Sequence, residues 1–299
     1  MSERPDGFRD SPGSSSLGAS SFSSPITRQD LPIGVFDSGV GGLTVLRALR
    51  GHLPDERFIY LGDTARLPYG TKSRDSVLRY STQAAEFLIR RGIKYLVIAC
   101  NTASSVSVEA LRERFAPVPV IGVIEPGATA GCAASKSGEI GVIATEGTVL
   151  GGAYQRAIAA IRPDAVVVAQ PCSLFVSLAE EGWTEGPIAE AIAHRYLDEV
   201  FASHPAIDTL LLGCTHFPLL IDALKAVVRP SVAIVDSAET TAVALAKDLV
   251  ARDLAAQRRR APAISLMATD GPQRFARVGS RFLGEEFESQ QVELVDLMG

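Results

Sequence analysis

The chain has few cysteines, and their spacing excludes several classes of protein. Its 299 residues contain four cysteines, at positions 100, 132, 172 and 214, with no C-x-x-C pair. A fold built on a disulfide framework is therefore excluded, and reduced thiols indicate a cytoplasmic protein. The cysteines and the four histidines also lack the spacing of a metal site, so we expect no metal ion.

The sequence also lacks an excess of positive charge and a long apolar run. Its net charge is −5 at pH 7, which gives no support for a nucleic-acid surface. No apolar stretch approaches the ~20 residues that cross a membrane, so no membrane partner is expected. Residues 1–30 have no apolar core of a secretory signal, and their serine-rich composition predicts a disordered tail.

From residue 31 onward, short apolar runs alternate with helical stretches. Such runs are typical of strands buried on both faces, and the alternation predicts a doubly wound α/β fold with parallel-rich sheets. Each half repeats a strand, a Cys-polar-polar turn and a helix, so we expect two similar α/β domains with the active site in the cleft between them. The expected strands are 32–37, 57–61, 95–99, 119–124, 139–144, 165–169, 208–212 and 232–235, and the expected helices are 42–51, 73–91, 103–115, 148–161, 187–203, 217–228 and 238–254.

Two of the cysteines end apolar strands and open polar turns. Cys100 follows KYLVIA, and Cys214 follows DTLLLG. Open α/β sheets place their ligands at the carboxyl ends of strands, and a helix N-terminus there favours a thiolate. Two thiols that face one cleft can remove a proton from one face of a carbon and return it to the other, which indicates a cofactor-free racemase. A free cysteine is otherwise most often a small core residue, the interpretation adopted for Cys132 and Cys172.

Other polar side chains are candidates for assisting these thiols. By placement we pair Asp37, at the end of the first strand, with Cys100, and His216 with Cys214, so that each supplies a base for its thiol. In LAEEGW, Glu180 and Glu181 precede a Gly-Trp turn. A helix C-terminus disfavours an anion, so a carboxylate there either has a specific partner or belongs to a solvated pair.

The glycine-rich turn DSGVGG after the first strand allows other functions. Gly39 and Gly41 fit a dinucleotide-binding fingerprint, but its third position is Thr44, and a P-loop lysine is absent. Backbone N–H groups at such a turn bind a substrate carboxylate equally well. A nucleotide-binding enzyme therefore remains an alternative that predicts ATP or NAD binding. A two-lobed amino-acid-binding protein is another, and it predicts binding without turnover.

Eight segments of the chain occur in a consistent order from about residue 33 to 239. They are FDSGVGGLTV, YLGDTARLPYG, ACNTAS, VIGVIEPGA, GVIATEGTV, LAEEGW, LGCTHFPLL and VDSAE. Together they resemble the glutamate racemase family, cofactor-independent enzymes that make D-glutamate for the bacterial cell wall, and TDGPQRFARVGSRFLG suits the family's C-terminal region. The CTHFP form favours glutamate over the alternative, an aspartate or other amino-acid racemase of the same fold.

The resemblance implies a set of site residues. The two acid/base thiols would be Cys100 and Cys214, and their helpers Asp37, His216 and Glu180, the last preferred to Glu181 on the LAE segment. Substrate contacts would come from Asp37, Ser38, Tyr69, Gly70, Asn101, Thr102, Thr145, Thr148, Thr215 and His216.

The resemblance also implies an organisation for the chain. One domain would comprise residues 31–121 plus 238–299, and the second residues 122–237. No cofactor is implied. Glutamate would be the small-molecule substrate, and the enzyme would be a cytoplasmic homodimer without nucleic-acid or membrane partners.

Overall fold

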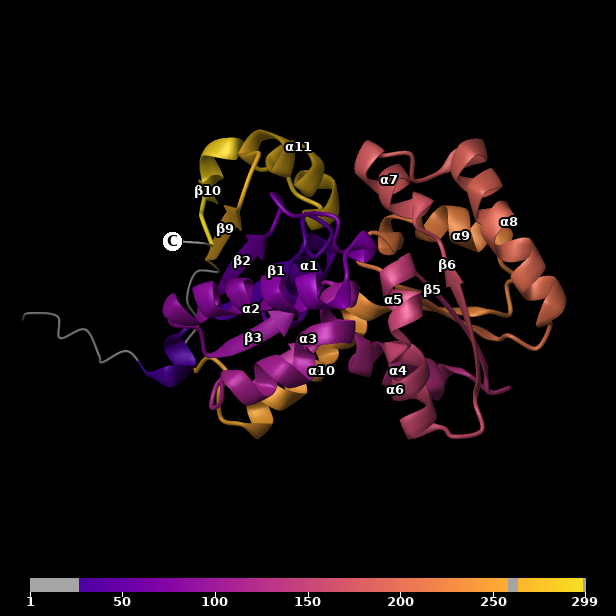
Figure 1. The fold of residues 1–299 in the computed structure, drawn as a ribbon, viewed down its shortest axis with the longest axis horizontal. Coiled ribbons are helices and arrows are strands. Elements are labelled where there is room, and N and C mark those ends of the chain that lie inside the picture. The colour runs from indigo at the N-terminus through magenta and orange to yellow at the C-terminus, as the bar shows by residue number, and fades with distance from the viewer. Residues whose placement is uncertain (1–26, 258–262, 298–299) are drawn as a thin grey trace, which may run out of the picture.

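Two parallel sheets lie side by side in the computed structural model, which describes residues 27–257 and 263–297 (Figure 1). Within those residues, one sheet has six strands in the order β10-β9-β2-β1-β3-β4, and the other has four in the order β6-β5-β7-β8. Neighbouring strands are parallel throughout. The strands of the first sheet are β1 (Ile33–Asp37), β2 (Phe58–Gly62), β3 (Tyr95–Ile98), β4 (Val120–Gly122), β9 (Ile264–Ala268) and β10 (Val292–Leu294), and those of the second are β5 (Glu139–Ala144), β6 (Val166–Pro171), β7 (Thr209–Gly213) and β8 (Ala233–Asp236).

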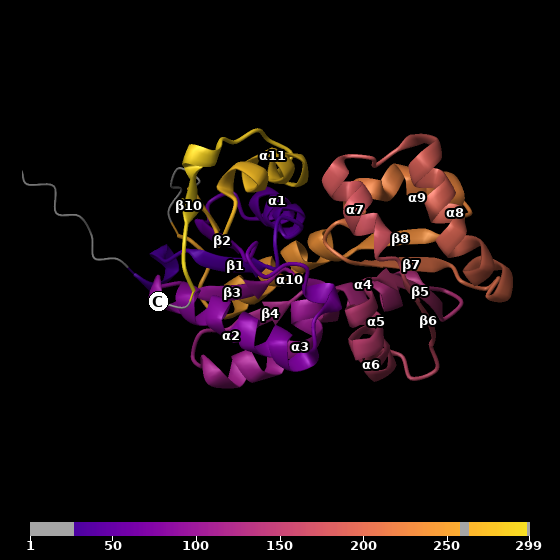
Figure 2. The same cartoon turned by 45° about the horizontal axis from the view of Figure 1, so that its top comes forward.

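Helices cover both faces of each sheet, as Figure 2 shows. This layering is that of a doubly wound fold, so the prediction of two α/β units with parallel sheets is confirmed. Around the first sheet, α1 (Leu43–His52) and α11 (Pro272–Leu283) lie on one face, and α2 (Arg74–Arg90) and α3 (Asn101–Arg114) on the other. Around the second sheet, one face carries α7 (Leu174–Glu181), α8 (Gly186–Ser203) and α9 (Ile221–Val227), and the other carries α4 (Ile124–Ala134), α5 (Glu146–Gly151) and α6 (Ala153–Ile161).

The chain passes between the two sheets twice. It leaves the first sheet after β4 and returns through α10 (Ser237–Ala251), which follows β8 and packs against α1 and α4. Because all strands of a sheet run the same way, their carboxyl ends lie along one edge. The two strands that precede Cys100 and Cys214, β3 and β7, are internal strands of the two sheets.

The apolar pattern did not reveal every element. Within the described residues, the prediction omitted the strands β9 and β10 and the helix α11, and it gave no bounds for the helices α4 and α7. The strand β10 has only three residues, and α4 carries glycines and a proline that mask a helical pattern. These elements take their structure from packing against neighbours rather than from local propensity.

Two expected helices have different extents in the structure. The helix expected over 148–161 is divided by Gly152, whose φ of +63° ends α5 and begins α6. The segment expected to be helical over 217–228 begins with a 3-10 turn, η3 (Phe217–Leu220), and α9 follows it. Pro218 has no backbone N–H to donate. It stands near the N-terminus of η3, where the first N–H groups of a helix have no partner within the helix, so the proline is tolerated there.

The expected disordered tail falls mainly on residues 1–26, which lie outside the described residues. Residues 27–30 are described, and they belong to the fold. They form a 3-10 turn, η1 (Arg28–Asp30), after Thr27. Arg28 donates to the Pro117 carbonyl at 3.1 Å, and Gln29 donates to the Asp253 carboxylate at 3.1 Å.

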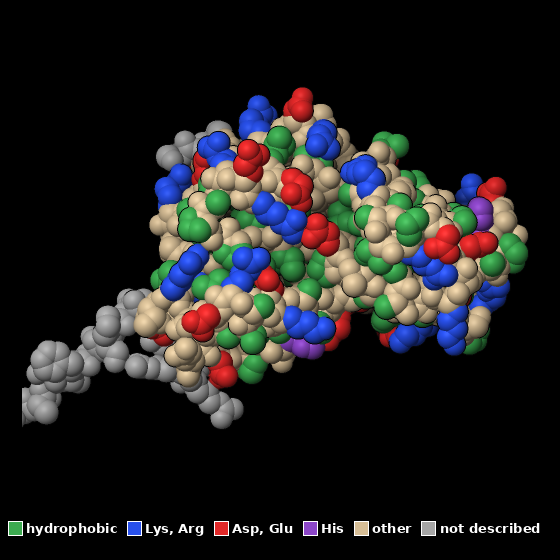
Figure 3. Space-filling model, turned by 90° about the horizontal axis from the view of Figure 1, so that it is seen from below, with side chains coloured by type: hydrophobic (Ala, Val, Ile, Leu, Met, Phe, Trp, Pro, Cys, Tyr) green, Lys and Arg blue, Asp and Glu red, His purple; other side chains and the backbone are tan. Residues whose placement is uncertain are grey.

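Charges of both signs are interspersed over the face of the molecule shown in Figure 3. The coloured part of that face carries no continuous basic surface, in keeping with the net charge of −5. Among the helices that the structure describes, none combines the length and apolar character needed to cross a bilayer.

A buried ion pair anchors the start of β3, the strand that leads to Cys100. The Lys94 ammonium is fully buried and pairs with the Glu56 carboxylate, which is 4% exposed. The same ammonium donates to the Gln29 carbonyl at 2.8 Å, and the backbone N–H of Ala256 donates to Glu56 at 2.8 Å. Burial lowers the pKa of Lys94, and the adjacent carboxylate opposes that shift. One ion pair thus joins four separate segments of the first unit.

Replacing Lys94 with methionine should destabilise the protein strongly. The Glu56 carboxylate would remain buried without its cation, a change that typically costs about 3 kcal/mol or more. Urea unfolding followed by far-ultraviolet circular dichroism measures the loss. The control is Lys225→Met, a substitution of an exposed lysine on α9, which should change stability by less than about 0.5 kcal/mol. If the free energy of unfolding of Lys94→Met lay within about 1 kcal/mol of the parental value, the stabilising role given to the ion pair would be contradicted.

Candidate active site

Cys100 lies in the turn between β3 and α3. It is the N-cap residue of α3, and its sulfur accepts a hydrogen bond from the backbone N–H of Ala103 at 3.4 Å. Its thiol also donates to the Ser38 hydroxyl at 3.6 Å, which connects it to the glycine-rich turn after β1. The residue is 6% exposed.

Cys214 occupies the corresponding turn after β7. Its sulfur lies 3.8 Å from Nδ1 of His216, and the Thr215 hydroxyl lies 3.5 Å from the same nitrogen. Cys214 is also 6% exposed. Each unit therefore presents one nearly buried thiol at the carboxyl end of an internal strand.

The glycine-rich turn of the first unit touches the thiol turn of the second. A Cβ atom at Gly41 would lie 2.3 Å from the Thr215 hydroxyl and 2.5 Å from the His216 ring, so only glycine fits there. The Thr44 hydroxyl donates to the Thr215 carbonyl at 2.9 Å across the same contact. These contacts bring both cysteine turns into one site, and the charge of Cys214 contributes to the raised pKa of Cys100.

Asp37 ends β1 beside this contact and is 1% exposed. Its Oδ2 accepts a hydrogen bond from the backbone N–H of Gly39 at 2.8 Å. Its Oδ1 has no hydrogen-bond partner among the residues that the structure describes. Burial raises the pKa of Asp37, and the nearby His216 opposes that shift. The site thus holds a buried carboxylate oxygen that is free to accept a hydrogen bond.

His216 links Cys214 to a carboxylate. Its Nε2 lies 3.2 Å from Oε1 of Glu180, and Arg274 donates to Oε2 of the same carboxylate at 2.7 Å. Burial would lower the pKa of His216, but hydrogen bonds to Cys214 and Glu180, with the charges of Cys214 and Asp37, raise it to about 10. The imidazole is therefore protonated at neutral pH.

The two neighbouring glutamates of α7 differ in their surroundings. Hydrogen bonding to His216 lowers the pKa of Glu180, and Arg274 adds to the effect. Glu181 is exposed. The structure thus places Glu180, of the two, against His216.

Asn101 and three threonine hydroxyls line the contact between α3 and the second unit. The Thr102 hydroxyl lies 3.0 Å from that of Thr145 and 3.1 Å from that of Thr148, and the latter two are 3.1 Å apart. The Asn101 side-chain oxygen accepts a hydrogen bond from Tyr154 at 2.8 Å, whereas its Nδ2 is buried without a partner in the described chain. The cluster therefore holds polar groups that a small anion or amino acid can bind.

Tyr69 and Gly70 reach the same region from the loop after β2. Gly70 approaches the second unit so closely that a Cβ atom there would lie 2.9 Å from Thr145. The Tyr69 phenol is fully buried and donates to the Asp63 carboxylate, which also accepts from Arg66 at 2.7 Å. The Tyr69 hydroxyl therefore donates its hydrogen to Asp63, and the groups of this segment that can bind a ligand are those of its backbone.

At Cys100, the effect of burial on the thiol pKa is larger than the opposite effect of the helix N-terminus. The sequence led us to expect that α3 would favour a thiolate there. Instead, burial and the charge of Asp37 raise the pKa of Cys100 to about 12, although the hydrogen bond from Ala103 lowers it. Cys100 is therefore a thiol at neutral pH in the unliganded protein.

Sequence reasoning missed Tyr154 and Arg274 as members of this site. Tyr154 belongs to α6 and Arg274 to α11, and Tyr154 stands in none of the segments that carry the resemblance. Only the tertiary arrangement brings them to Asn101 and Glu180. The sole signal for Arg274 was its place in TDGPQRFARVGSRFLG.

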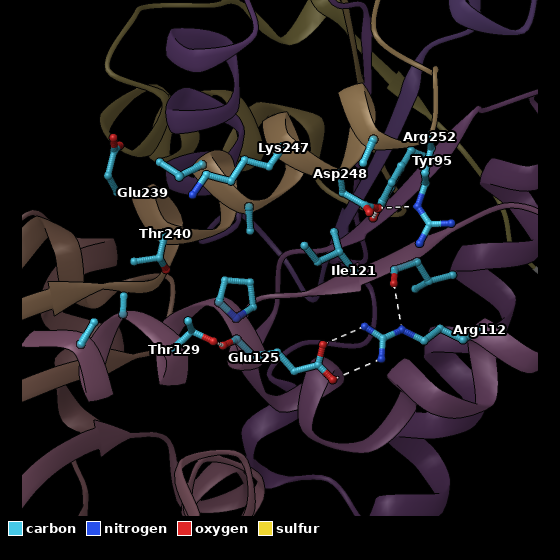
Figure 4. Close-up of a pocket in the computed structure, with 17 residues that line it drawn as sticks. Tyr95, Arg112, Ile121, Glu125, Thr129, Glu239, Thr240, Lys247, Asp248 and Arg252 are labelled. Carbon is cyan, nitrogen blue, oxygen red and sulfur yellow. Dashed lines mark hydrogen bonds and ion pairs between the residues drawn. The ribbon is translucent and has the colours of Figure 1, made fainter. Parts of the chain in front are cut away.

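A cavity away from the thiols lies between α3, α4 and α10 (Figure 4). It has a volume of about 800 Å³, and two ion pairs lie at its edge, Arg112 with Glu125 and Arg252 with Asp248. None of the residues that line it is a candidate site residue. Its size alone therefore does not make it the catalytic centre.

Comparison with known proteins places the chain in one family. The family model for Asp/Glu/hydantoin racemases matches residues 44–245, more than half of the chain. A glutamate racemase of Geobacter metallireducens is 49% identical over 252 residues, which cover 84% of this chain and 92% of the relative.

Solved structures agree with this assignment. The glutamate racemase of Francisella tularensis in complex with D-glutamate superposes with a TM-score of 0.83 at 38% identity and covers 90% of this chain and 98% of its own. The enzyme of Thermus thermophilus in complex with β-chloro-D-alanine gives a TM-score of 0.81 at 44% identity, with the same coverage of 90% and 98%. The chain therefore belongs to the Asp/Glu/hydantoin racemase family and, within it, to the glutamate racemases.

Proposed function

We propose that the protein interconverts L- and D-glutamate by proton transfer at Cα between two thiols, without a cofactor. The observation that carries this proposal is the pair of nearly buried cysteines, Cys100 and Cys214, that two facing strand ends contribute to one site. Membership of the glutamate racemases supports the reaction, and a solved relative in complex with D-glutamate supports the substrate.

The protonation states of the two turns suit a two-base mechanism. Cys100 carries its proton, so the base of the first step is the sulfur of Cys214, which lies 3.8 Å from Nδ1 of the protonated His216 ring. The thiolate takes the Cα proton from one face, and the electron pair of the broken C–H bond stays on the substrate as a carbanion. The opposite thiol then gives its proton to the other face. The reaction ends with thiol and thiolate exchanged and the configuration at Cα inverted.

The helper side chains support this exchange from both sides. Glu180 neutralises and orients the His216 imidazolium, with which Cys214 is in contact. Asp37 raises the pKa of the Cys100 thiol, so it makes that thiolate a stronger base once it forms. We assign Asp37 to Cys100 and His216 to Cys214.

The polar groups around the thiols form a binding site for an amino acid. The free Oδ1 of Asp37 is a suitable acceptor for an ammonium group, and the free Nδ2 of Asn101 is a suitable donor to a carboxylate. We assign further substrate contacts to the hydroxyls of Ser38, Thr102, Thr145, Thr148 and Thr215, to His216 and to the backbone of Tyr69 and Gly70. Most of this set is buried, and the low access of water strengthens its interactions with the carbanion.

We infer the cellular role from the same family membership. The product D-glutamate would serve peptidoglycan synthesis, and the reduced cysteines suit an enzyme of the cytoplasm. The family resemblance supports a homodimer, and analytical ultracentrifugation of the purified chain distinguishes a dimer from a monomer.

Purified protein should racemise glutamate without any added cofactor. The circular dichroism of an L-glutamate solution should decay towards zero, because both enantiomers become equally populated. L-Aspartate in a parallel cell tests the alternative substrate. Decay with aspartate alone would replace glutamate as the substrate, and no decay with either, in folded and reduced protein, would refute a racemase.

Alanine at either Cys100 or Cys214 should reduce racemisation at least about a hundredfold. Each variant lacks the group that transfers the proton on one face of Cα. The matched control is Cys132→Ala, which removes a partly buried thiol of α4 and should retain the parental rate. Full activity in either active-site variant would rule out the two-thiol mechanism.

The raised pKa of His216 predicts a pH dependence of stability. The folded-state pKa is about 10 and the ordinary value is 6.5, so the protonated ring stabilises the fold fully below pH 6.5. This stabilisation is lost as the pH rises towards 10. Between these values, the free energy of unfolding of the parent should fall more steeply with pH than that of His216→Asn, by up to about 1.4 kcal/mol per pH unit.

Denaturant titrations at pH 7, 8 and 9 measure this difference in slope. The control is His194→Asn, because His194 is an exposed histidine of α8 whose side chain meets only Asp198, at 2.9 Å, among the ion pairs described. It should keep the parental slope. An unchanged slope in His216→Asn would show that the ring is not protonated in the folded protein.

A further inference from the structure

Tyr154 contacts both of the turns that carry the thiols, the turn of Cys100 and the turn of Cys214. It belongs to α6 of the second unit and is 1% exposed. Its ring packs against the residue before Cys214, since a Cβ atom at Gly213 would lie 3.0 Å from Tyr154 Cε2. Its hydroxyl donates a hydrogen bond of 2.8 Å to the side-chain oxygen of Asn101, the residue after Cys100. One side chain thus contacts the neighbour of each thiol.

This hydrogen bond holds the Asn101 amide by its side-chain oxygen. The two ends of an amide have nearly the same shape but opposite hydrogen-bonding character. Because the phenol places its hydrogen on Oδ1, the NH₂ group of Asn101 is turned away from Tyr154. That Nδ2 is buried and has no partner within the described chain. A buried donor without a partner is costly, so its presence beside Cys100 indicates a ligand that accepts from it.

We propose that Tyr154 is a positioning residue for racemisation, which holds the Asn101 amide by its oxygen so that its N–H donors serve a substrate carboxylate. The inference rests on the proposed function and on the place of Asn101 in the site. Tyr154 and Asn101 come from different units, so their hydrogen bond also joins the two halves of the site around a bound amino acid. Tyr154 acts through Asn101 and takes no part in proton transfer.

The hydroxyl is separable from the ring by mutation. Tyr154→Phe keeps the ring against Gly213 and removes only the donor to Asn101. The amide can then turn, which loses about one hydrogen bond to the substrate. We expect KM to rise about tenfold for both enantiomers of glutamate, with a smaller change in kcat.

A double-mutant cycle tests whether Tyr154 acts through Asn101. The cycle compares the parent, Tyr154→Phe, Asn101→Ala and the double variant by circular dichroism assays in both directions. In the Asn101→Ala background there is no amide left to orient, so Tyr154→Phe should produce no further rise in KM. Equal and additive effects in the two backgrounds would overturn the proposal, as would a parental KM in Tyr154→Phe.

A second tyrosine controls for the loss of a buried hydroxyl. Tyr95 is 2% exposed and donates to Asp248 at 2.6 Å, beside the cavity of Figure 4 rather than beside the thiols. Tyr95→Phe should leave KM unchanged. Melting temperatures of all variants fix an assay temperature at which each is folded.

Calorimetric binding of D-glutamate to the same variants separates this proposal from the proposed function. If the parent binds glutamate but does not racemise it, the proposed function fails, and the cycle in Kd still decides the role of Tyr154. If the parent does not bind glutamate at all, both proposals fail. If the parent binds and racemises glutamate but the effects of Tyr154→Phe and Asn101→Ala are additive in both Kd and KM, the proposal for Tyr154 fails and the proposed function stands.

Discussion

The approach of the glycine-rich turn to the His216 ring holds the rest of the site together. At Gly41, the first unit comes so close to Thr215 and His216 that no side chain fits between them. Thr44 adds a hydrogen bond to the Thr215 carbonyl at 2.9 Å. Each sheet alone presents one thiol, and a single thiol can serve only one face of a carbon. The proposed two-thiol mechanism therefore depends on this contact between the units, because it brings the second thiol into the same site as the first.

The same closeness concentrates charge in a region that excludes water. Asp37, His216 and Glu180 all lie within this buried or partly buried set, and isolated buried charges are unfavourable. A chain of contacts offsets two of these charges: Arg274 pairs with Glu180, Glu180 pairs with His216, and His216 contacts the sulfur of Cys214. At Cys100, burial together with the charge of Asp37 keeps the proton in place. Two chemically identical side chains thus have different surroundings: the Cys100 thiol is buried beside Asp37, and the Cys214 sulfur faces the His216 ring.

Part of this architecture could be predicted from the sequence, because its signals are local. The buried strands β1, β3 and β7 are nearly continuous apolar runs, and each ends at a polar turn that marks the site, so Asp37, Cys100 and Cys214 stand out. The direction of the shift in the pKa of Cys100 could not be predicted from such local signals. The helix N-terminus is visible in the sequence, whereas the burial that overrides it depends on how the second unit covers the turn. Tyr154 and Arg274 were missed for the same reason, since their partners Asn101 and Glu180 are far away in the chain.

The unpaired polar atoms of the site point to what completes it. Folded proteins satisfy nearly all of their buried polar groups, yet the Asp37 Oδ1 acceptor and the Asn101 Nδ2 donor both lack partners within the described chain. An α-amino acid brings an ammonium donor and carboxylate acceptors in one small molecule, which matches this pair. An ammonium beside Asp37 would also offset the charge that disfavours a thiolate at Cys100. Substrate binding would then lower the cost of moving the negative charge between the two sulfurs, which is the requirement of a reaction that runs equally in both directions.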